Sequence, residues 1–345
     1  MQIRVFSNLS VSLMLLVGLL SLSAFGEDLP EPAASGDDGA REASAFLALL
    51  DDDLRAEGVR AINDPERFQW TYLAGPRAGI RLGDLNAEQS RAFAAFLSAT
   101  LSDAGLRRIE QIRAIEPVED RGGGVQTGPD DYWVRFYGDP SKVGKPGSPS
   151  VWAWRLEGHH LVLNAAVVDG EVVSISPLFF GASPRRGDAR SRESVRGVEP
   201  LRGEDELAAG LLASLDPLQK SRARSSDPAP RDIRSGTRKA PGDLSSEGLQ
   251  LSRMNERQRA VIDTIVDGYL GTWPKSAQRV IRNRHQSSDP ADIRFLWRGL
   301  EDRNAPHYWR ISGPYLIIEY WNGLNNADHV HVVVRTRHGE FASAP

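Results

Sequence analysis

The sequence contains no cysteine. This absence excludes disulfide bonds, thiolate metal ligands, a cysteine nucleophile and the lipid-bearing cysteine of a bacterial lipoprotein. After residue 26 the chain also lacks any apolar run of the about 20 residues that cross a bilayer. It has no excess of basic charge, since the formal net charge is −4. We therefore expect no membrane span in the mature chain and no nucleic-acid partner.

The familiar short catalytic motifs are missing as well. The sequence has no nucleophile elbow, no P-loop, no dinucleotide-binding fingerprint and no His-Glu-x-x-His helix. Three glycines at 122–124 lack the strand-to-helix context of a phosphate-binding loop. Any chemistry must come from residues that are distant in sequence.

The N-terminus predicts a secretory signal peptide over residues 1–26. A basic start with Arg4 precedes an apolar stretch, and Ala24 and Gly26 provide small residues before an acidic segment. An uncleaved membrane anchor is the alternative, but the apolar stretch is short for one. We predict cleavage after Gly26, a polar leader at 27–40, and a periplasmic or extracellular protein.

Three sequence blocks occur twice in the same order, which predicts a tandem duplication. The matching pairs are 46–58 with 211–223, 79–97 with 248–266, and "WAWRLEGHHLVLN" (152–164) with "HYWRISGPYLIIE" (307–319). The predicted repeat units are 41–181 and 204–340, separated by a polar linker at 182–203.

Each predicted unit consists of helices followed by an antiparallel meander, an α+β fold with approximate two-fold symmetry. An amphipathic helix opens each unit, at about 41–57 and 204–222. A later helix begins at Asn86 or Asn255, each followed three residues on by a glutamine, as in a capping box. β-rich runs complete each unit, and a second polar stretch at 224–246 is expected to form an exposed loop.

The blocks "WAWRLEGHHLVLN", "PLFFGASP" and "GPYLIIEYWNGLNNADHVHVVVR" resemble signatures of the bacterial family catalogued as domain of unknown function 3500. The family pattern favours Tyr-Asp-Asn and Asn-His-Ile-His, where this chain has Tyr320-Trp321-Asn322 and Asp328-His329-Val330-His331. Neither departure removes a histidine. The resemblance covers nearly the whole mature chain and implies an exported protein without an assigned activity.

The strand around His329 and His331 carries the main chemical signal. Residues two apart in a strand point to the same face. If strand 315–321 pairs with it, Trp321 is expected opposite His329 and Glu319 opposite His331. Two imidazoles and a carboxylate commonly bind zinc or another divalent metal with an open position.

The first unit has histidines at a different place, His159 and His160. As strand residues they would point to opposite faces, so we predict that only His160 joins the metal site, with Asn164 on its side. Gly158 would allow close approach of the chain there. His159 is then a neighbouring, ligand-binding residue.

Other polar residues are assigned supporting roles. Asp328 is a candidate acceptor for an imidazole N–H. Arg155 and Arg310 could clamp an anion, although a structural ion pair is the favoured interpretation. His307 could be a rim residue or a ligand, and His285 and His338 are expected on the surface.

Three hypotheses remain open from the sequence. The first is a hydrolase in which His160, His329, His331 and Glu319 bind zinc or a similar ion, with Glu319 catalytic and a metal-bound water of pKa near ~7 as nucleophile. The second is a non-catalytic protein that binds copper, zinc or a small molecule. The third is a structural protein whose histidines are solvated on a strand face.

Overall fold

Asn86 and Asn255 each cap a helix, as the sequence predicts. The side-chain oxygen of Asn86 accepts a hydrogen bond from the backbone N–H of Gln89. The side-chain oxygen of Gln89 in turn accepts one from the backbone N–H of Asn86. Asn255 and Gln258 form the same reciprocal pair. These capping boxes satisfy N–H groups that a helix start leaves without partners. They fix the starts of α3 (Ala87–Thr100) and α7 (Glu256–Leu270).

The computed structural model describes residues 36–120, 126–145, 149–237, 244 and 246–342. All of them belong to one compact unit, Ala33–Pro345. The predicted signal peptide, 1–26, and most of the predicted leader lie outside the described residues.

The predicted opening helix of each repeat unit is two helices in the structure. Asp51 and Asp216 interrupt the helical run, because each side chain accepts a backbone N–H and starts a new helix. The remaining helices are α1 (Gly36–Ala48), α2 (Asp52–Gly58), α4 (Asp103–Ile115), α5 (Arg202–Ser214), α6 (Pro217–Ala223) and α8 (Lys275–Gln286). Short 3₁₀ helices are η1 (Pro65–Phe68), η2 (Leu82–Asp84), η3 (Pro140–Lys142), η4 (Glu193–Val195), η5 (Leu251–Arg253), η6 (Asn325–Ala327) and η7 (Glu340–Ala342).

The strands of the described chain form a large mixed sheet, with a separate hairpin of β3 and β4. The path through the sheet is β1-β5-β6-β7-β9-β14-β13-β12-β11-β10, with β2 on β5 and β8 on β7. Only β1 runs parallel to its neighbour. The strands of the first half are β1 (Val59–Arg60), β2 (Ile80–Arg81), β3 (Glu119–Asp120), β4 (Gln126–Thr127), β5 (Tyr132–Gly138), β6 (Val151–Gly158), β7 (Leu161–Val168), β8 (Glu171–Ser174) and β9 (Leu178–Ala182). Those of the second are β10 (Leu249–Gln250), β11 (Arg294–Gly299), β12 (His307–Ser312), β13 (Leu316–Leu324) and β14 (His329–Thr336).

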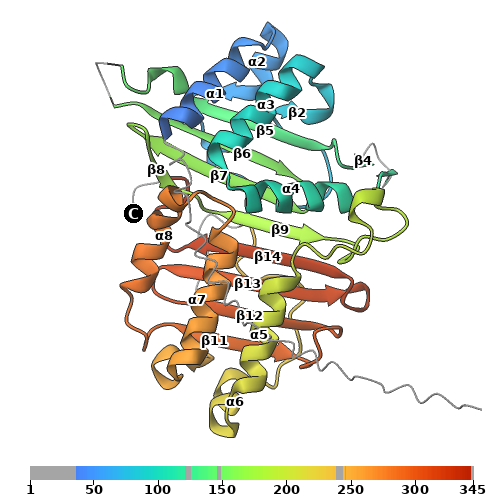
Figure 1. Cartoon of the computed structure of the whole chain (residues 1–345), viewed down its shortest axis with the longest axis vertical. Helices are drawn as coiled ribbons and strands as arrows, with labels where there is room; N and C mark the ends of the chain where they lie inside the picture. Colours follow the sequence, from blue (N-terminus) through green and yellow to red (C-terminus); the bar gives the residue numbers. More distant parts are fainter. Residues whose placement is uncertain (1–35, 121–125, 146–148, 238–243, 245, 343–345) are drawn as a thin grey trace, which may run out of the picture. The chain divides into compact units, whose positions relative to one another are not determined.

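The two halves of the chain join at β9 and β14, which pair antiparallel in the middle of the sheet (Figure 1). Phe180 lies opposite Val332, and Leu178 lies opposite Val334. This continuous hydrogen-bonded junction brings the loops of one half next to the strands of the other.

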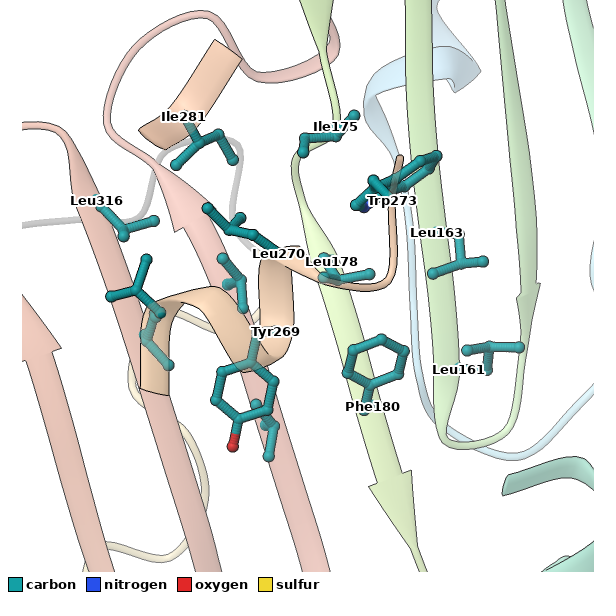
Figure 2. Packing of buried hydrophobic residues seen from close by; sticks show 14 of the residues in the cluster. Leu161, Leu163, Ile175, Leu178, Phe180, Tyr269, Leu270, Trp273, Ile281 and Leu316 are labelled. Carbon is teal, nitrogen blue, oxygen red and sulfur yellow. The ribbon is translucent and has the colours of Figure 1, made fainter. Parts of the chain in front are cut away.

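Helices cover one face of the sheet, which we call the helix face (Figure 1). The main hydrophobic core lies there and contains buried residues from helices and strands of both halves. Figure 2 shows Leu270 and Trp273, at and just after the end of α7, beside Leu178 of β9. Apolar burial across the junction therefore connects the halves in addition to the strand pairing.

The opposite face, which we call the open face, is covered by two irregular segments. They are the first cover segment, 67–72, and the second cover segment, 229–236, and both contribute to a separate cluster of buried aromatic and aliphatic residues. The guanidinium of Arg155 donates to two carbonyls of the first segment. Glu319 accepts N–H groups of the second.

The polar stretch 224–246 is thus not simply an exposed loop, as the sequence predicted. Ser235 is fully buried and Ile233 nearly so. The composition is rich in Pro, Asp and Ser, which suits a turn, but buried charged side chains satisfy its backbone groups and hold it on the sheet. Among the described residues no helix is long and apolar enough to cross a membrane.

Candidate functional site

The strand β14 places His329 and His331 on one side, as the alternation of strand side chains predicts. Their ring centroids are 4.6 Å apart. In the sheet register, His331 lies between Trp321 of β13 and Gly181 of β9, and His329 lies opposite Leu324. His331 belongs to the open face, where its ring contacts Tyr72 and Trp321.

His159 and His160 occupy the two-residue turn between β6 and β7. Gly158 pairs with Leu161 directly across this turn. His160 has a φ of 66°, which a residue with a side chain rarely adopts. The prediction that the two imidazoles point to opposite faces was wrong, because turn residues do not alternate. Their rings stack with centroids 3.6 Å apart.

Two glycines give these imidazoles their space. A Cβ on Gly181 would lie 2.7 Å from Cδ2 of His160, and the Gly181 N–H donates to the His160 carbonyl oxygen over 2.7 Å. Gly158 lies against Tyr132, where a Cβ would come within 2.5 Å of the ring. The Tyr132 hydroxyl donates to the carbonyl oxygen of His159. The close approach predicted at Gly158 is therefore present.

Three imidazoles from both halves of the chain converge at one point. His160, His329 and His331 each offer a ring nitrogen, and the three nitrogens lie within 4.8 Å of one another. Nε2 of His160 is 2.9 Å from Nε2 of His329. His160 is fully buried, His331 is 5% exposed and His329 is half-buried. The group could hold a metal ion; we call it the histidine centre.

Glu116 holds the histidines of the turn. One carboxylate oxygen lies 2.5 Å from Nδ1 of His159 and the other lies 3.0 Å from Nδ1 of His160. Glu116 is buried and directly follows α4, where the negative end of the helix dipole disfavours a carboxylate. The two imidazoles compensate for that position. Glu116, His159 and His160 form a second group of side chains that could hold a metal.

Asp232 of the second cover segment holds His331. Its Oδ1 lies 2.7 Å from Nδ1 of His331, and its Oδ2 accepts the hydroxyl of Tyr72 over 3.0 Å. Burial raises the pKa of Asp232, but the hydrogen bonds from His331, from the Ile233 N–H and from the Tyr72 hydroxyl outweigh burial, so the pKa is lowered overall. Burial and the Asp232 charge raise the pKa of Tyr72, which therefore remains a donor.

His329 is the imidazole most clearly uncharged. Burial, followed by the neighbouring His331 and His159, lowers the pKa of His329 to about 3. At neutral pH it thus carries no proton beyond that of the neutral ring. A neutral imidazole keeps one nitrogen lone pair, which is what a metal ligand requires.

The hydrogen bonds fix which nitrogens face the centre. A carboxylate only accepts, so Nδ1 of His160 and of His331 donate to Glu116 and Asp232. In the neutral form of each ring, Nε2 is then the nitrogen with the lone pair. Carboxylate-bonded imidazoles of this kind are the usual ligands of protein zinc. Two nitrogens at zinc bond lengths in a tetrahedral shell lie about 3.3 Å apart. The 2.9 Å between His160 and His329 needs to widen by only a few tenths of an ångström.

Glu319 does not lie with the imidazoles. The predicted register of β13 and β14 was wrong by two residues, because Trp321 pairs with His331 and Glu319 pairs with Val333. The reason is that β13 continues to Leu324, which pairs with His329 after an irregularity in the ladder. The buried carboxylate accepts the Tyr308 hydroxyl over 2.8 Å and the N–H groups of the second cover segment. It is absent from both candidate metal groups of the described residues.

The remaining predicted residues lie in other contacts. Asp328 is exposed, and its Oδ1 accepts the N–H of Arg185 instead of an imidazole proton. Asn164 accepts from Arg155 and donates to the carbonyl of Pro177. Neither side chain is bonded to an imidazole of the histidine centre: Asn164 bonds the loop after β8, and Asp328, which precedes β14, bonds the segment after β9.

The other cations and histidines follow the same pattern. Arg310 is fully buried and lies opposite Glu319 in the sheet, and Arg155 bonds the first cover segment and lies 3.3 Å from Glu157. His307 is also fully buried, with Nε2 2.8 Å from Asp205 and Nδ1 2.9 Å from the carbonyl of Ala305. His285 was expected on the surface, but it is buried in the last turn of α8, and His338 is exposed as expected.

The sequence profile of a family described as "Protein of unknown function (DUF3500)" matches residues 33–343. The chain belongs to the DUF3500 family. Comparisons with curated proteins and with solved structures found no match. The DUF3500 description assigns no chemistry, so the residues at the histidine centre must supply it.

Sequence reasoning missed two important residues of this DUF3500 chain, Glu116 and Asp232. Glu116 follows a helix in "AIEPVED", a context that resembles many helix ends. Asp232 lies in the polar stretch predicted as an exposed loop. The only available signal for Asp232 was that its loop, "SSDPAPRDIR", occupies the same place in the second half as "NDPERFQW" in the first.

Proposed function

We propose that this DUF3500 protein is a metal-dependent hydrolase whose single divalent ion, zinc by preference, is bound by His160, His329 and His331. The observation that carries the proposal is the convergence of three ring nitrogens within 4.8 Å. Unrelated surface histidines would not be held toward one point by buried carboxylates. Here two are oriented by carboxylates and the third is neutral.

The donor set favours zinc and an open site. Three neutral imidazoles are a common catalytic zinc set, and the fourth position is left for water or substrate. Bound zinc lowers the pKa of that water to near ~7 and polarises a carbonyl oxygen. Copper also accepts imidazole nitrogen, so metal preference is part of the test.

His159 is the residue best placed to move a proton beside the centre. Its ring lies 3.6 Å from that of His160, and Glu116 holds its Nδ1. Its Nε2 is then left for exchange with a reacting group or solvent, since about a tenth of the residue is exposed. A carboxylate-oriented imidazole is a common general acid and base. Glu319, predicted as the catalytic carboxylate, supports the second cover segment instead.

The test is turnover by the full chain with and without metal. We expect zinc-loaded protein to hydrolyse an activated ester such as p-nitrophenyl acetate. Removal of zinc by a chelator should lower the rate by at least about 100-fold, and added zinc should restore it. His331→Ala should behave like the stripped protein, and His338→Ala, which changes an exposed histidine elsewhere, should retain activity. Equal rates before and after chelation would rule out the hydrolase.

A second function, metal sequestration without turnover, is supported by a different observation. Glu116 and His159 form their own candidate group with His160. If one of them swings onto the ion, the coordination shell closes and no position is left for substrate. Stoichiometric metal binding without any turnover would favour this alternative.

We also infer that the protein is exported and is built from a duplicated unit. The N-terminal pattern supports export through cleavage after Gly26. Two helices, a short strand, a 3₁₀ helix, two helices and three strands occur in this order before both β9 and β14, which supports duplication. The first half has β1, η1, β3, β4, η3 and β8 in addition, and the second has η6. The halves then contribute different ligands, the turn of β6–β7 from one and the start of β14 from the other. N-terminal sequencing of secreted protein tests the cleavage, and superposition of the halves in an experimental structure tests the repeat.

A further inference from the structure

Three large apolar side chains that neighbour residues of the histidine site in the sheet or in the sequence are exposed. Leu73 is 61% exposed, Val118 is 82% exposed and Leu324 is 49% exposed. Single exposed apolar residues are ordinary on protein surfaces. These three come from separate parts of the chain. Leu324 pairs with His329 of the centre in the sheet, and Leu73 and Val118 are close in sequence to Tyr72 and Glu116, which contact its histidines. We call the three exposed side chains the apolar rim.

Leu324 is the strand partner of His329 across β13 and β14. Leu73 follows Tyr72, whose carbonyl oxygen accepts the N–H of His160 and whose ring centroid is 5.0 Å from that of His331. Leu324 is therefore next to the histidine centre in the sheet. Leu73 directly follows the first cover segment, whose last residue contacts the centre.

Val118 completes the apolar rim from the helix side. It lies two residues after Glu116, which contacts both His159 and His160. Its Cγ2 would be 3.3 Å from a Cβ on Gly128, so it lies against a glycine and not in a hydrophobic core. A polar, metal-binding centre with exposed apolar side chains beside it suits a ligand that has a polar group at the end of an apolar chain.

The charge of the centre narrows the class of ligand further. The three ligand imidazoles are neutral in the proposed site, and the carboxylates of Glu116 and Asp232 offset the two positive charges of a divalent ion. A centre without net positive charge has little attraction for a phosphate or sulfate group. A neutral carbonyl compound, which needs only polarisation by the metal, fits better.

We propose that the histidine centre hydrolyses an ester or amide of a hydrophobic acyl group, with the acyl chain lying on Leu73, Val118 and Leu324. In the reaction a water oxygen forms a bond to the acyl carbon, and the bond from that carbon to the ester oxygen or amide nitrogen breaks. The departing oxygen or nitrogen takes up a proton, which gives an acid and an alcohol or amine. This inference rests on the proposed metal-dependent hydrolase.

The test uses the cobalt-loaded full chain and hydroxamates, which bind a catalytic metal through their polar end. We expect octanohydroxamate to bind at least about tenfold more tightly than acetohydroxamate, because covering two methylene groups already suffices for that ratio. The visible spectrum of cobalt reports binding. Equal affinity for both hydroxamates, or tighter binding of methylphosphonate than of acetohydroxamate, would overturn the proposed class.

Variants test whether the apolar rim causes the tighter binding of octanohydroxamate. In the combined variant Leu73→Ser, Val118→Ser and Leu324→Ser, we expect the affinity ratio to fall below about threefold while metal content and acetohydroxamate affinity stay unchanged. The matched control is Leu218→Ser with Leu300→Ser, which changes two similarly exposed leucines elsewhere. A rim variant that keeps the full ratio contradicts the proposal. Failure of the hydrolase proposal looks different, because the wild-type chain would then bind no cobalt, or would bind cobalt without binding any hydroxamate and without hydrolysing p-nitrophenyl acetate.

Discussion

At the residue scale, the histidine centre depends on small features of the backbone as much as on the imidazoles. His160 adopts a left-handed conformation in a two-residue turn, where its ring covers Gly181. A non-glycine residue in that region costs free energy, which the surrounding contacts must offset. The bonds to Glu116 and to the Gly181 N–H are such contacts.

Gly181→Ala tests this dependence. The added Cβ would lie 2.7 Å from the His160 ring and 2.9 Å from the carbonyl oxygen of Val330, so the imidazole must move. We expect zinc affinity to fall at least about tenfold, because a displaced ligand no longer meets the other two. Isothermal titration with zinc measures it. Gly210→Ala is the control, because a Cβ there meets nothing within 4 Å; equal affinities in both variants would refute the role of Gly181.

Glu116→Gln tests the carboxylate that orients the turn. Loss of its charge weakens the hydrogen bonds to His159 and His160, and we expect zinc affinity to fall by about 10- to 100-fold. Glu110→Gln, an exposed change on the same helix, is the matched control. Unchanged zinc affinity in Glu116→Gln would mean that the carboxylate only supports the fold.

At the scale of elements, two irregular cover segments cover the open face of the sheet, as the helices cover the helix face. Their backbone groups are satisfied by buried side chains of the strands, chiefly Arg155 for one segment and Glu319 for the other. The second segment also delivers Asp232 to His331. Stability and site geometry are therefore connected through the same segment.

Glu319→Gln separates a structural role from a metal-binding one. The buried carboxylate accepts two N–H groups and the Tyr308 hydroxyl, and hydrogen bonds to a charged acceptor are worth about 1.5–3 kcal/mol each. We expect the free energy of unfolding to fall by about 2–3 kcal/mol, since the amide retains part of this bonding. Denaturant titration measures it. Zinc stoichiometry should stay at one, and loss of zinc without loss of stability would restore Glu319 as a ligand.

His285, in the last turn of α8, is expected to make the stability of the fold depend on pH. Burial lowers the pKa of His285 below 6.5, against a smaller opposing effect of Asp267. The unfolded chain therefore takes up a proton at this residue at a higher pH than the folded chain does. The resulting stability is fully present above pH 6.5 and is lost as the pH falls toward the folded pKa.

We expect His285→Gln to flatten the decrease in unfolding free energy as the pH falls below 6.5, measured by denaturant titration at several pH values. The variant His338→Gln, at an exposed position, should follow the wild-type curve. Identical slopes for His285→Gln and the wild type would exclude His285 as a source of the decrease.

At the scale of the whole molecule, the local features of the fold were predictable from sequence. The capping boxes at Asn86 and Asn255 are confirmed. Alternation placed His329 and His331 on one side correctly. These features depend on neighbours in sequence, and local chemistry decides them.

The parts that sequence could not predict depend on contacts between distant residues. Strand β13 continues beyond Trp321 to Leu324, so Glu319 pairs with Val333 and not with His331. Asp232 reaches the centre only because its segment folds over the sheet, and Glu116 only because α4 ends near the β6–β7 turn. No local pattern marks such positions. The convergence of His160 with the second-half histidines was predicted because the sequence placed unrepeated histidines in both halves.

The most direct test of the central claim is the number of zinc ions bound per full chain after equilibrium dialysis, with wild type, His331→Ala and His338→Ala side by side. The account predicts one ion for the wild type and for His338→Ala, and none for His331→Ala. Zinc retained at one ion per chain by His331→Ala, or no zinc bound by the wild type, would contradict it.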